Sequence, residues 1–360
     1  MKWDELQEEK VSHCGGLHPN TECSAPQEED PRGPTAPALR GIFHFKEENV
    51  KRLPNNTYLI GVDHGYGNMK GANVCFPTGI IAYDSEPLFT RNLLVFENKY
   101  YLIGEGHKEF LPNKALDEDY YILTLATIAE ELRRESITDA AVFIAAGLPL
   151  TWTTGGKKEF EGYLTRKPEV SFTYKKLDYH LRIVGAKIYP QGYAAVAPDV
   201  AKMDGVNLIC DIGNGTMNLL YIVDGMPETS RMFTEKYGTY QCTLMVRERF
   251  LQKTQREIPD AIIEKVLRTS TADIPKADLQ LITEIAETYA EGILRRLREH
   301  GYDGNTMKLI VTGGGGCLLS NFGKAPASVV KAKRIIRQHD ICAAAKGYEY
   351  LAELQLRAGK

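Results

Sequence analysis

One pattern occurs twice in this chain, and this internal repeat limits the possible folds more than any other feature. An apolar run ends in Asp63-His64-Gly65, and a second apolar run ends in Asp211-Ile212-Gly213, about 150 residues further along. Each is followed by a turn rich in Gly and Asn and then by another β-rich run. Two buried strands that each deliver a carboxylate to a tight turn predict two similar halves, whose turns face each other across a cleft.

The rest of the pattern fits this duplication. Short β-rich runs between residues 57 and 103, a helical segment from about 117 to 135 and an apolar strand at 140–146 make up the first half. The second half starts with strands between 207 and 233 and then turns mainly helical. A chain of 360 residues is long enough for two domains with separate cores. We therefore predict an α/β fold with two lobes, each a mixed β-sheet flanked by helices.

Composition argues against two classes of partner. With 44 basic and 47 acidic residues the net charge is −3, so no excess of positive charge favours direct binding to nucleic acid or to an anionic membrane. The longest apolar stretch, 140–150, is about half of the roughly 20 residues that span a bilayer. The seven cysteines are odd in number and lie mostly in apolar runs, as expected for buried thiols in a reducing compartment. We predict a cytoplasmic protein.

Residues 1–40 have a different character. They are rich in Glu, Pro, Gly and Cys and show neither a helical nor a strand period, which predicts a flexible N-terminal extension. His13, Cys14, His18 and Cys23 are residue types that bind zinc, but their spacing lacks a paired C-x-x-C. Whether these four residues bind a metal stays open.

The first turn has the chemistry of a phosphate site. Asp63 stands at the end of a strand, where a carboxylate can hold hydrated Mg²⁺. Glycines let backbone N–H groups approach phosphate oxygens, and a lysine adds a positive charge. The predicted contacts are Gly65, Tyr66, Gly67, Asn68 and Lys70. Taken alone, the same segment also fits a structural hairpin turn.

The second turn repeats this chemistry with neutral groups. Asp211 is placed to organise the water shell of the metal or the attacking water, and the polar turn residues to donate to a γ-phosphate. The predicted contacts are Gly213, Asn214, Gly215 and Thr216. Finding both turns in one chain makes two unrelated hairpins a poor explanation.

A third glycine turn follows a buried strand. Residues 308–311 run directly into Gly313, Gly314, Gly315 and Gly316 before an expected helix at 317–322. Backbone without side chains leaves room for a flat base and its ribose, and the amides at a helix start suit the α-phosphate. A flexible connector is the alternative.

These three motifs, in this order, resemble the actin, sugar-kinase and heat-shock ATPase superfamily, and the resemblance covers about residues 57–355. Within them, the first turn resembles the corresponding segment of ParM/StbA-type plasmid proteins, with the sequence Asp63-His64-Gly65-Tyr66-Gly67-Asn68-Met69-Lys70. The resemblance implies an actin-like fold, the ribonuclease H-like duplicated fold, with a nucleotide cleft between the lobes. The implied division is lobe I at 41–189, with a small subdomain inserted at about 75–110 and completed by a helix at 340–360, and lobe II at 190–339, with a small subdomain at about 238–303.

The same resemblance implies roles for individual residues. Asp63 and Asp211 would lie on the Mg²⁺ side of the nucleotide, bound through water, and Lys70 would contact the β- and γ-phosphates. Gln191, just before the second turn, matches the family's residue that positions the hydrolytic water. Because a neutral amide is no strong base, its role would be orientation. An ordinary glutamine at a helix start is the alternative.

Three further assignments concern two sites after the strands of the second half and one histidine in the first turn. Gly238 and Thr239 are expected to approach phosphate or ribose, and Arg247 or Glu248 to reach the edge of the base, although such charges are usual on a solvated helix face. His64 is expected to pack or hydrogen bond rather than to act in catalysis, because it alternates away from Asp63 on an extended strand.

The leading functional prediction is an ATPase that forms a helical filament from copies of itself and drives plasmid DNA segregation, with hydrolysis timing filament turnover. The cofactors would be Mg²⁺ and ATP, with GTP left open. The resemblance also implies a small DNA-binding adaptor of the ParR type on a centromere-like plasmid site. The alternatives are a small-molecule kinase on the same fold, for which no further catalytic Asp motif stands out, and a scaffold that does not hydrolyse nucleotide.

Overall fold

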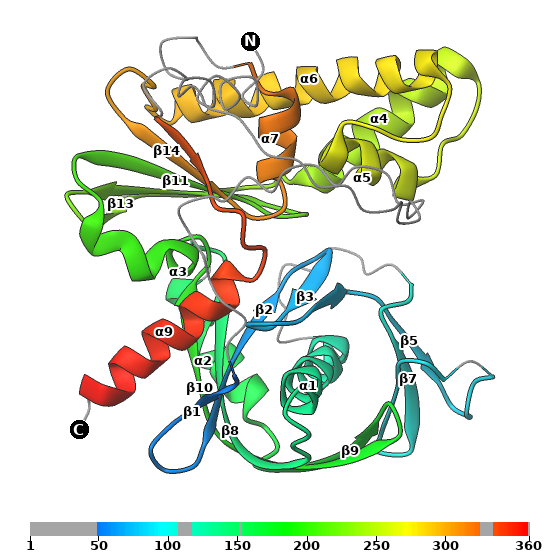
Figure 1. Cartoon of the computed structure of the whole chain (residues 1–360), viewed down its shortest axis with the longest axis vertical. Coiled ribbons are helices and arrows are strands. Elements are labelled where there is room, and N and C mark those ends of the chain that lie inside the picture. The colour runs from blue at the N-terminus through cyan, green and yellow to red at the C-terminus, as the bar shows by residue number, and fades with distance from the viewer. Residues whose placement is uncertain (1–48, 89, 107–116, 151–152, 325–333, 359–360) are drawn as a thin grey trace, which may run out of the picture.

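The computed structural model describes residues 49–88, 90–106, 117–150, 153–324 and 334–358. The predicted extension 1–40, with His13, Cys14, His18 and Cys23, lies outside these residues. Figure 1 shows two bodies stacked along the long axis, each a β-sheet with helices beside it. We call them lobe I, which contains strands β1 to β10, and lobe II, which contains β11 to β15.

Lobe I is built on one ten-stranded mixed sheet. In spatial order its strands are β4 (Cys75–Pro77), β3 (Asn68–Lys70), β2 (Tyr58–His64), β8 (Asp139–Leu148), β10 (Leu177–Pro190), β9 (Glu169–Tyr174), β6 (Leu93–Phe96), β7 (Lys99–Ile103) and β5 (Ile80–Tyr83), while β1 (Lys51–Arg52) pairs with β2. The central strands β2, β8 and β10 run parallel. Their carboxyl ends therefore meet at one edge of the sheet, where polar side chains at strand ends come together.

Alternation along the central strands assigns their side chains to two cores. Ile60, Val62 and Ile144 pack with α1 (Glu118–Arg133) and α2 (Thr153–Leu164) in the larger core. Leu59 and Ala145, on the other face, pack with α9 (Ala343–Ala358). Since both faces are covered, these strands are apolar almost throughout, as parallel strands usually are.

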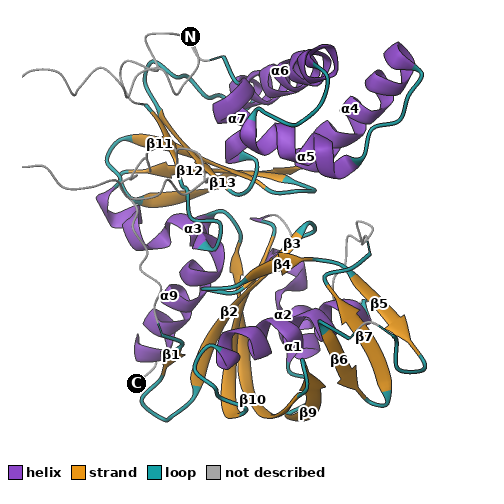
Figure 2. Cartoon of the chain, turned by 45° about the vertical axis from the view of Figure 1, so that its right-hand side comes forward, coloured by secondary structure: helices purple, strands orange, loops and turns teal. Residues whose placement is uncertain are grey.

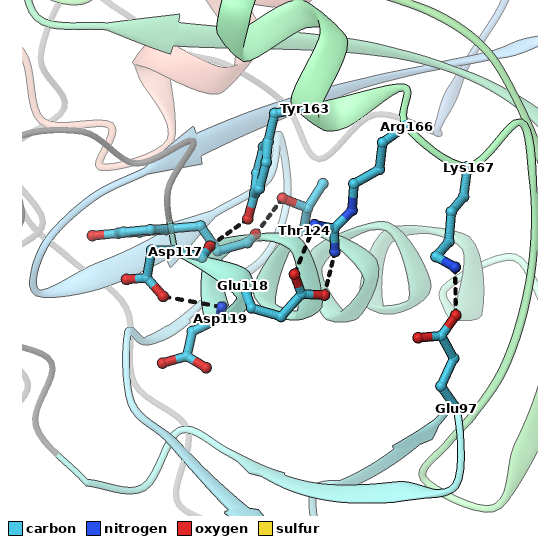
Figure 3. Close-up of polar contacts among 9 residues, drawn as sticks. Glu97, Asp117, Glu118, Asp119, Thr124, Tyr163, Arg166 and Lys167 are labelled. Carbon is cyan, nitrogen blue, oxygen red and sulfur yellow. Dashed lines mark hydrogen bonds and ion pairs between the residues drawn. The ribbon is translucent and has the colours of Figure 1, made fainter.

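The start of α1 is fixed by side chains that Figure 3 shows. Asp117 caps the helix by accepting from the N–H of Asp119 at 3.1 Å, and Tyr163 of α2 donates to the Asp117 carbonyl at 2.5 Å. Arg166, just after α2, pairs with Glu118 in the first turn of α1. Capping and an acidic residue at a helix start both stabilise it. These bonds fix the start of α1, which carries Thr124, against α2 and the residues that follow it.

Lobe II has a five-stranded sheet in the order β13 (Met226–Glu235), β12 (Met217–Val223), β11 (Val206–Ile212), β14 (Lys308–Thr312) and β15 (Ile335–Arg337). One face is covered by α4 (Thr239–Thr254), α5 (Asp260–Thr269), α6 (Lys276–Glu299) and α7 (Gly316–Phe322). The other face packs on the short helices α3 (Tyr193–Val196) and η5 (Ala197–Lys202). Helix α6 lies at the end of lobe II far from lobe I, whereas α5 lies on the side of lobe II that faces lobe I (Figures 1 and 2).

The α/β class with two lobes is confirmed, because two mixed sheets are each flanked by helices. Within the region predicted as an inserted subdomain, about 75–110, strand β6 joins the sheet of lobe I, since Leu94 and Val95 pair with Tyr174 and Thr173 of β9. No helix of the described residues has the length and apolar character needed to cross a bilayer.

Candidate nucleotide site

The first carboxylate turn joins β2 to β3 in lobe I. Asp63 lies opposite Lys70 in the antiparallel register, and Lys70 Nζ donates to Asp63 Oδ2 at 2.8 Å. Thr78 fastens the turn between them: its hydroxyl donates to the Gly65 carbonyl at 2.7 Å, and its N–H donates to the Gly67 carbonyl at 3.0 Å. The turn therefore presents a paired carboxylate and ammonium on a braced backbone.

His64 points away from this pair. Its imidazole is fully buried, and Nε2 lies 2.7 Å from the hydroxyl of Thr124 on α1. The rings of Tyr120 and Phe160 pack edge-on against it. The expected packing and hydrogen-bonding role is confirmed, and it follows from the alternation of side chains along β2.

The second carboxylate turn joins β11 to β12 in lobe II. Here Asp211 lies opposite Asn218, and the Thr312 hydroxyl of β14 donates to Asp211 Oδ1 at 3.0 Å. The Gly213 N–H donates to the Thr216 carbonyl at 2.8 Å, which closes the turn. The interaction with the Asn218 side chain lowers the pKa of Asp211, against the effect of burial. Neutral donors thus take the place that Lys70 holds in lobe I.

The two turns meet at one pocket of about 340 Å³ between the lobes. They are so close that a Cβ added at Gly67 would lie 2.7 Å from Asn214 Nδ2, so any side chain at position 67 would displace Asn214. The predicted residues that line the pocket are Asp63, Gly65, Tyr66, Gly67, Asn68, Lys70, Gln191, Asp211, Gly213, Asn214, Gly215, Thr216, Thr239, Gly313 and Gly314. Residues predicted from five separate segments of the sequence thus lie in one place.

Gln191 lies between the two carboxylates. Its backbone N–H donates to the Leu148 carbonyl at 2.8 Å, and its side-chain Nε2 donates to Asp63 Oδ1 at 3.1 Å. The next residue, Gly192, has φ of 78°, and a Cβ there would lie 3.2 Å from Asp211 Cβ. Glycine therefore allows the chain to turn from lobe I into lobe II directly over Asp211.

The charges in the pocket act on one another. Burial raises the pKa of Asp211, and the negative charge of Asp63 raises it further. Burial alone would lower the pKa of Lys70, but the charge and hydrogen bond of Asp63 outweigh it, so the net shift is upward. Two facing carboxylates with one ammonium leave a surplus of negative charge, which a divalent cation between the lobes would relieve. The pair therefore fits a hydrated Mg²⁺ that keeps most of its waters.

The third turn is only partly at the pocket. Gly313 has φ of 78°, and a Cβ there would lie 2.6 Å from Asp211 Oδ1, so this turn needs glycine. Gly314 also lines the pocket, whereas Gly315 and Gly316 are not among the described lining residues. Gly315 packs on Ile212, where a Cβ would lie 2.2 Å from Cγ2, and Gly316 lies close to Arg337. The first two glycines face the pocket and the last two let α7 pack behind it.

At the start of α4, too, only some of the predicted residues line the pocket. Thr239 lines the pocket, while Gly238 is packed behind the second turn, where a Cβ would lie 2.2 Å from the Asn214 carbonyl oxygen. Thr243, one turn further along α4, also faces the pocket. Arg247, one further turn along α4, does not line the pocket, and its guanidinium forms an ion pair with the Asp260 carboxylate at 3.3 Å.

The prediction that Arg247 or Glu248 reaches the base edge therefore has to be corrected, since neither lines the pocket. At that end the lining side chains come from α5 instead: Glu264, Leu267 and Arg268. Their spacing of three and four residues puts them on one stripe of the helix. An amphipathic helix shows such a stripe anyway, so no local signal in the sequence marks these residues as part of a site.

Direct metal coordination by protein alone has no candidate here: no group of three or more His, Cys, Asp or Glu side chains gathers as a metal site among residues 49–358 outside the undescribed gaps. The cluster of His13, Cys14, His18 and Cys23 lies outside the described part of the chain. A metal in the pocket would be held through water and phosphate oxygens, which the two carboxylates can support.

Comparisons with known proteins agree with this architecture. Residues 61–193 match the family described as the N-terminal domain of actin-like proteins. No curated protein sequence matches the chain significantly.

The solved structures extend the likeness over most of the chain. A 15-stranded ParM filament from Clostridium botulinum superposes with a TM-score of 0.66 at 19% identity, over 83% of this chain and 99% of that one. The archaeal actin homologue Ta0583 in complex with ADP gives 0.64 at 17% identity, over 82% and 99%. Bacillus thuringiensis ParM with ATP gives 0.58 at 15% identity, over 85% and 100%. The chain thus has the actin fold, and its residues 61–193 match the family model for the N-terminal domain of actin-like proteins.

Proposed function

We propose that this protein is a cytoplasmic ATPase that assembles into actin-like filaments and drives the segregation of plasmid DNA. One observation carries the proposal: Asp63 and Asp211 come from equivalent turns of two lobes and line one pocket together with Lys70 and Gln191. Such a pocket can bind a triphosphate only by contacting both lobes at once.

The chemistry assigned to the pocket uses positioning and charge. Lys70 and the backbone N–H groups of the two turns bind the β- and γ-phosphates, as point charge and amide donors do in other phosphate sites. Asp63 and Asp211 hold hydrated Mg²⁺, which neutralises charge on the phosphate oxygens. Gln191 orients the attacking water, since an amide lacks the basicity to take its proton in full.

Assembly follows from the two-lobe geometry. A γ-phosphate that contacts both turns favours the arrangement in which the lobes are close, and a ligand shifts an equilibrium toward the state it binds better. The closed arrangement would present the longitudinal contact surface, which must be heterologous and open-ended to give a helix and not a ring. Loss of phosphate after hydrolysis removes this bias and limits the lifetime of the filament. The solved filament of a ParM with this fold supports the assignment.

The plasmid role and its partner follow from the resemblance of the first turn to ParM/StbA-type proteins. A small DNA-binding adaptor of the ParR type would connect the filament to a centromere-like site, because a net charge of −3 does not favour direct binding of this chain to DNA. ATP is the proposed nucleotide; the ADP and ATP complexes of structural relatives support it over GTP.

The test is to add Mg-ATP, and separately Mg-GTP, to the purified protein while recording light scattering and phosphate release. We expect scattering above a critical concentration with ATP, followed by phosphate release. Scattering without phosphate release would indicate a non-hydrolysing scaffold. ADP production that requires a small hydroxylated substrate, with no scattering, would indicate a kinase and would overturn the proposal.

A further inference from the structure

Helix α9 covers the face of the lobe I sheet from which the catalytic side chains project. Alternation puts Asp63 of β2 on the same face as Leu59, which packs against α9. Tyr189 of β10 also belongs to this core, and Gln191 lies two residues beyond it. Any α9 side chain that reaches the carboxyl edge of the sheet therefore lies close to the side chains of Asp63 and Gln191.

The helix reaches the sheet because three glycines make room for it. A Cβ at Gly61 would lie 2.1 Å from the Ala345 carbonyl oxygen of α9, and a Cβ at Gly347 would lie 1.8 Å from the Ala194 carbonyl oxygen. The side chain of Glu349 then accepts a hydrogen bond from the Gly61 N–H at 2.9 Å. Backbone contacts on both sides thus fix the position of α9 along the sheet.

Tyr348 fills the space that the third glycine leaves. A Cβ at Gly147 would lie 2.1 Å from the Tyr348 hydroxyl oxygen and 2.2 Å from Cζ, so the end of the ring lies directly over this residue of β8. Gly147 pairs with Tyr189 in the sheet, two residues before Gln191. The glycine therefore lets a long side chain from α9 carry its hydroxyl to the end of the central strand, between β2 and β10.

The hydroxyl lies close enough to the Gln191 side chain to interact with it, but it has no hydrogen bond of acceptable geometry within the described residues, although Tyr348 is fully buried. Burial, together with the charges of Asp63 and Asp211, raises its pKa well above the usual value, so the group keeps its proton throughout the accessible pH range. A buried hydroxyl without a partner costs free energy that a purely apolar ring would not. Phenylalanine would fill the same volume, so packing does not account for the oxygen.

Gln191 needs a second contact of this kind. Its Nε2 donates to Asp63 Oδ1 at 3.1 Å, which leaves the carbonyl half of the amide without a described partner. The terminal torsion of a glutamine is broad, so one hydrogen bond does not fix the plane of its amide. A donor from the opposite side would fix it, and the amide oxygen would keep a second lone pair for water.

We propose that Tyr348 is a positioning residue for hydrolysis: during turnover its hydroxyl donates to the carbonyl oxygen of Gln191 and holds the amide in the orientation that aligns the attacking water. This inference rests on the proposed function, because it assigns a role within the same hydrolytic site. It also gives α9 a part in catalysis that the three nucleotide motifs do not contain.

Tyr348→Phe tests this with the smallest possible change. Removing one hydrogen bond that orients a catalytic group should lower kcat for phosphate release about 3- to 10-fold. The KM and the affinity for ATP should stay unchanged, because Tyr348 is not among the lining residues of the pocket. The melting temperature should not fall, since the hydroxyl makes no hydrogen bond in the described part of the resting protein.

Tyr121→Phe is the matched control. Tyr121 is also buried in lobe I, its hydroxyl likewise lacks a hydrogen bond to described residues, and it does not line the pocket. This variant should release phosphate at the wild-type rate. An equal loss in both variants would show a general effect of removing buried hydroxyls and would overturn the assignment.

A double-mutant cycle with Gln191→Ala gives the decisive readout. If Tyr348 acts through Gln191, adding Tyr348→Phe to Gln191→Ala should cause no further loss of kcat. Two independent, multiplying losses would overturn the inference, as would wild-type kcat in Tyr348→Phe alone. Failure of the proposed function looks different, because wild-type protein would then release no phosphate at all.

Discussion

The two carboxylate turns have the same architecture and different chemistry. In each, an aspartate ends a buried strand and faces, across an antiparallel pair, the residue seven positions later. That residue is Lys70 in lobe I and Asn218 in lobe II. Asp63 is therefore ion-paired at 2.8 Å, while Asp211 receives only neutral donors such as Thr312.

This difference assigns separate tasks to the two lobes. Lobe I has its own cation, Lys70, which in the proposed site would bind phosphate oxygens. Lobe II carries a buried carboxylate with a raised pKa, whose charge is supported only when a cation arrives with the ligand. The two turns thus share a backbone arrangement, while the residue that faces the aspartate is charged in lobe I and neutral in lobe II.

The largest effect is expected from removing the charge in lobe II. Asp211→Asn keeps the shape and the hydrogen bond from Thr312 but loses the carboxylate that we propose to organise the metal and water. Phosphate release should fall about 10²- to 10³-fold, the usual cost of losing one group that stabilises charge in a transition state. Measurement is by single-turnover phosphate release, with exposed Asp204→Asn in the same lobe as control. Turnover at the wild-type rate in Asp211→Asn would remove Asp211 from the site.

The second test makes lobe I chemically like lobe II. Lys70→Asn copies the residue at position 218 and removes the ammonium that pairs with Asp63. Affinity for ADP should fall about 10- to 100-fold, since hydrogen bonds to charged groups contribute about 1.5–3 kcal/mol.

Adenosine, which lacks phosphates, should bind Lys70→Asn as it binds the wild type. Calorimetric titration of both ligands measures this, and Lys202→Asn on the surface serves as control. Equal losses for ADP and adenosine would mean that Lys70 supports the fold and not the phosphates.

A third test uses stability and not function. Two residues before each aspartate, lobe I has Gly61 and lobe II has the buried Ile209. Gly61→Ala should lower the free energy of unfolding by about 1–3 kcal/mol, because its Cβ would meet the backbone of α9. Ile209→Val should cost about 0.5–1.5 kcal/mol. Denaturant unfolding compares them; a neutral Gly61→Ala would show that α9 can move away from the sheet.

The smallest effect concerns the pH dependence of stability. The raised pKa means that folded Asp211 keeps its proton above the ordinary value of 3.8, while the unfolded chain has already lost it. The native state then binds more protons, so this group lowers stability as pH rises from 3.8 toward the raised pKa.

Asp211→Asn should therefore melt at a higher temperature than the wild type at pH 7 without nucleotide. The gap should close as the pH falls below 3.8. Thermal melts across this range check the sign. A lower melting temperature for the variant at pH 7 would mean that Asp211 stabilises the empty protein and that the comparison with Asp63 is reversed.

Sequence reasoning succeeded where local pattern dictates position. Asp63 and Asp211 follow apolar strands, and strand alternation is enough to separate Asp63 from His64. It failed for Arg247 because how far along α4 the pocket extends depends on how that helix packs. Glu264 and Arg268 were missed for the same reason, as was Tyr348, whose approach depends on a glycine in a distant strand. Local backbone chemistry is readable from sequence, whereas contacts between elements far apart in the chain are not.

The packing of α9 on Gly61 and Gly147 of the lobe I sheet also affects how the chain folds during synthesis on the ribosome. Every strand and helix of lobe II leaves the ribosome before α9 does, so lobe II can fold as a unit while synthesis continues. In lobe I, the apolar side chains of Leu59, Ala145 and Tyr189 stay uncovered until Tyr348 and Ala352 have been synthesised and pack against them. For that interval the nascent chain exposes an apolar sheet face, and we expect it to be the main target for chaperones.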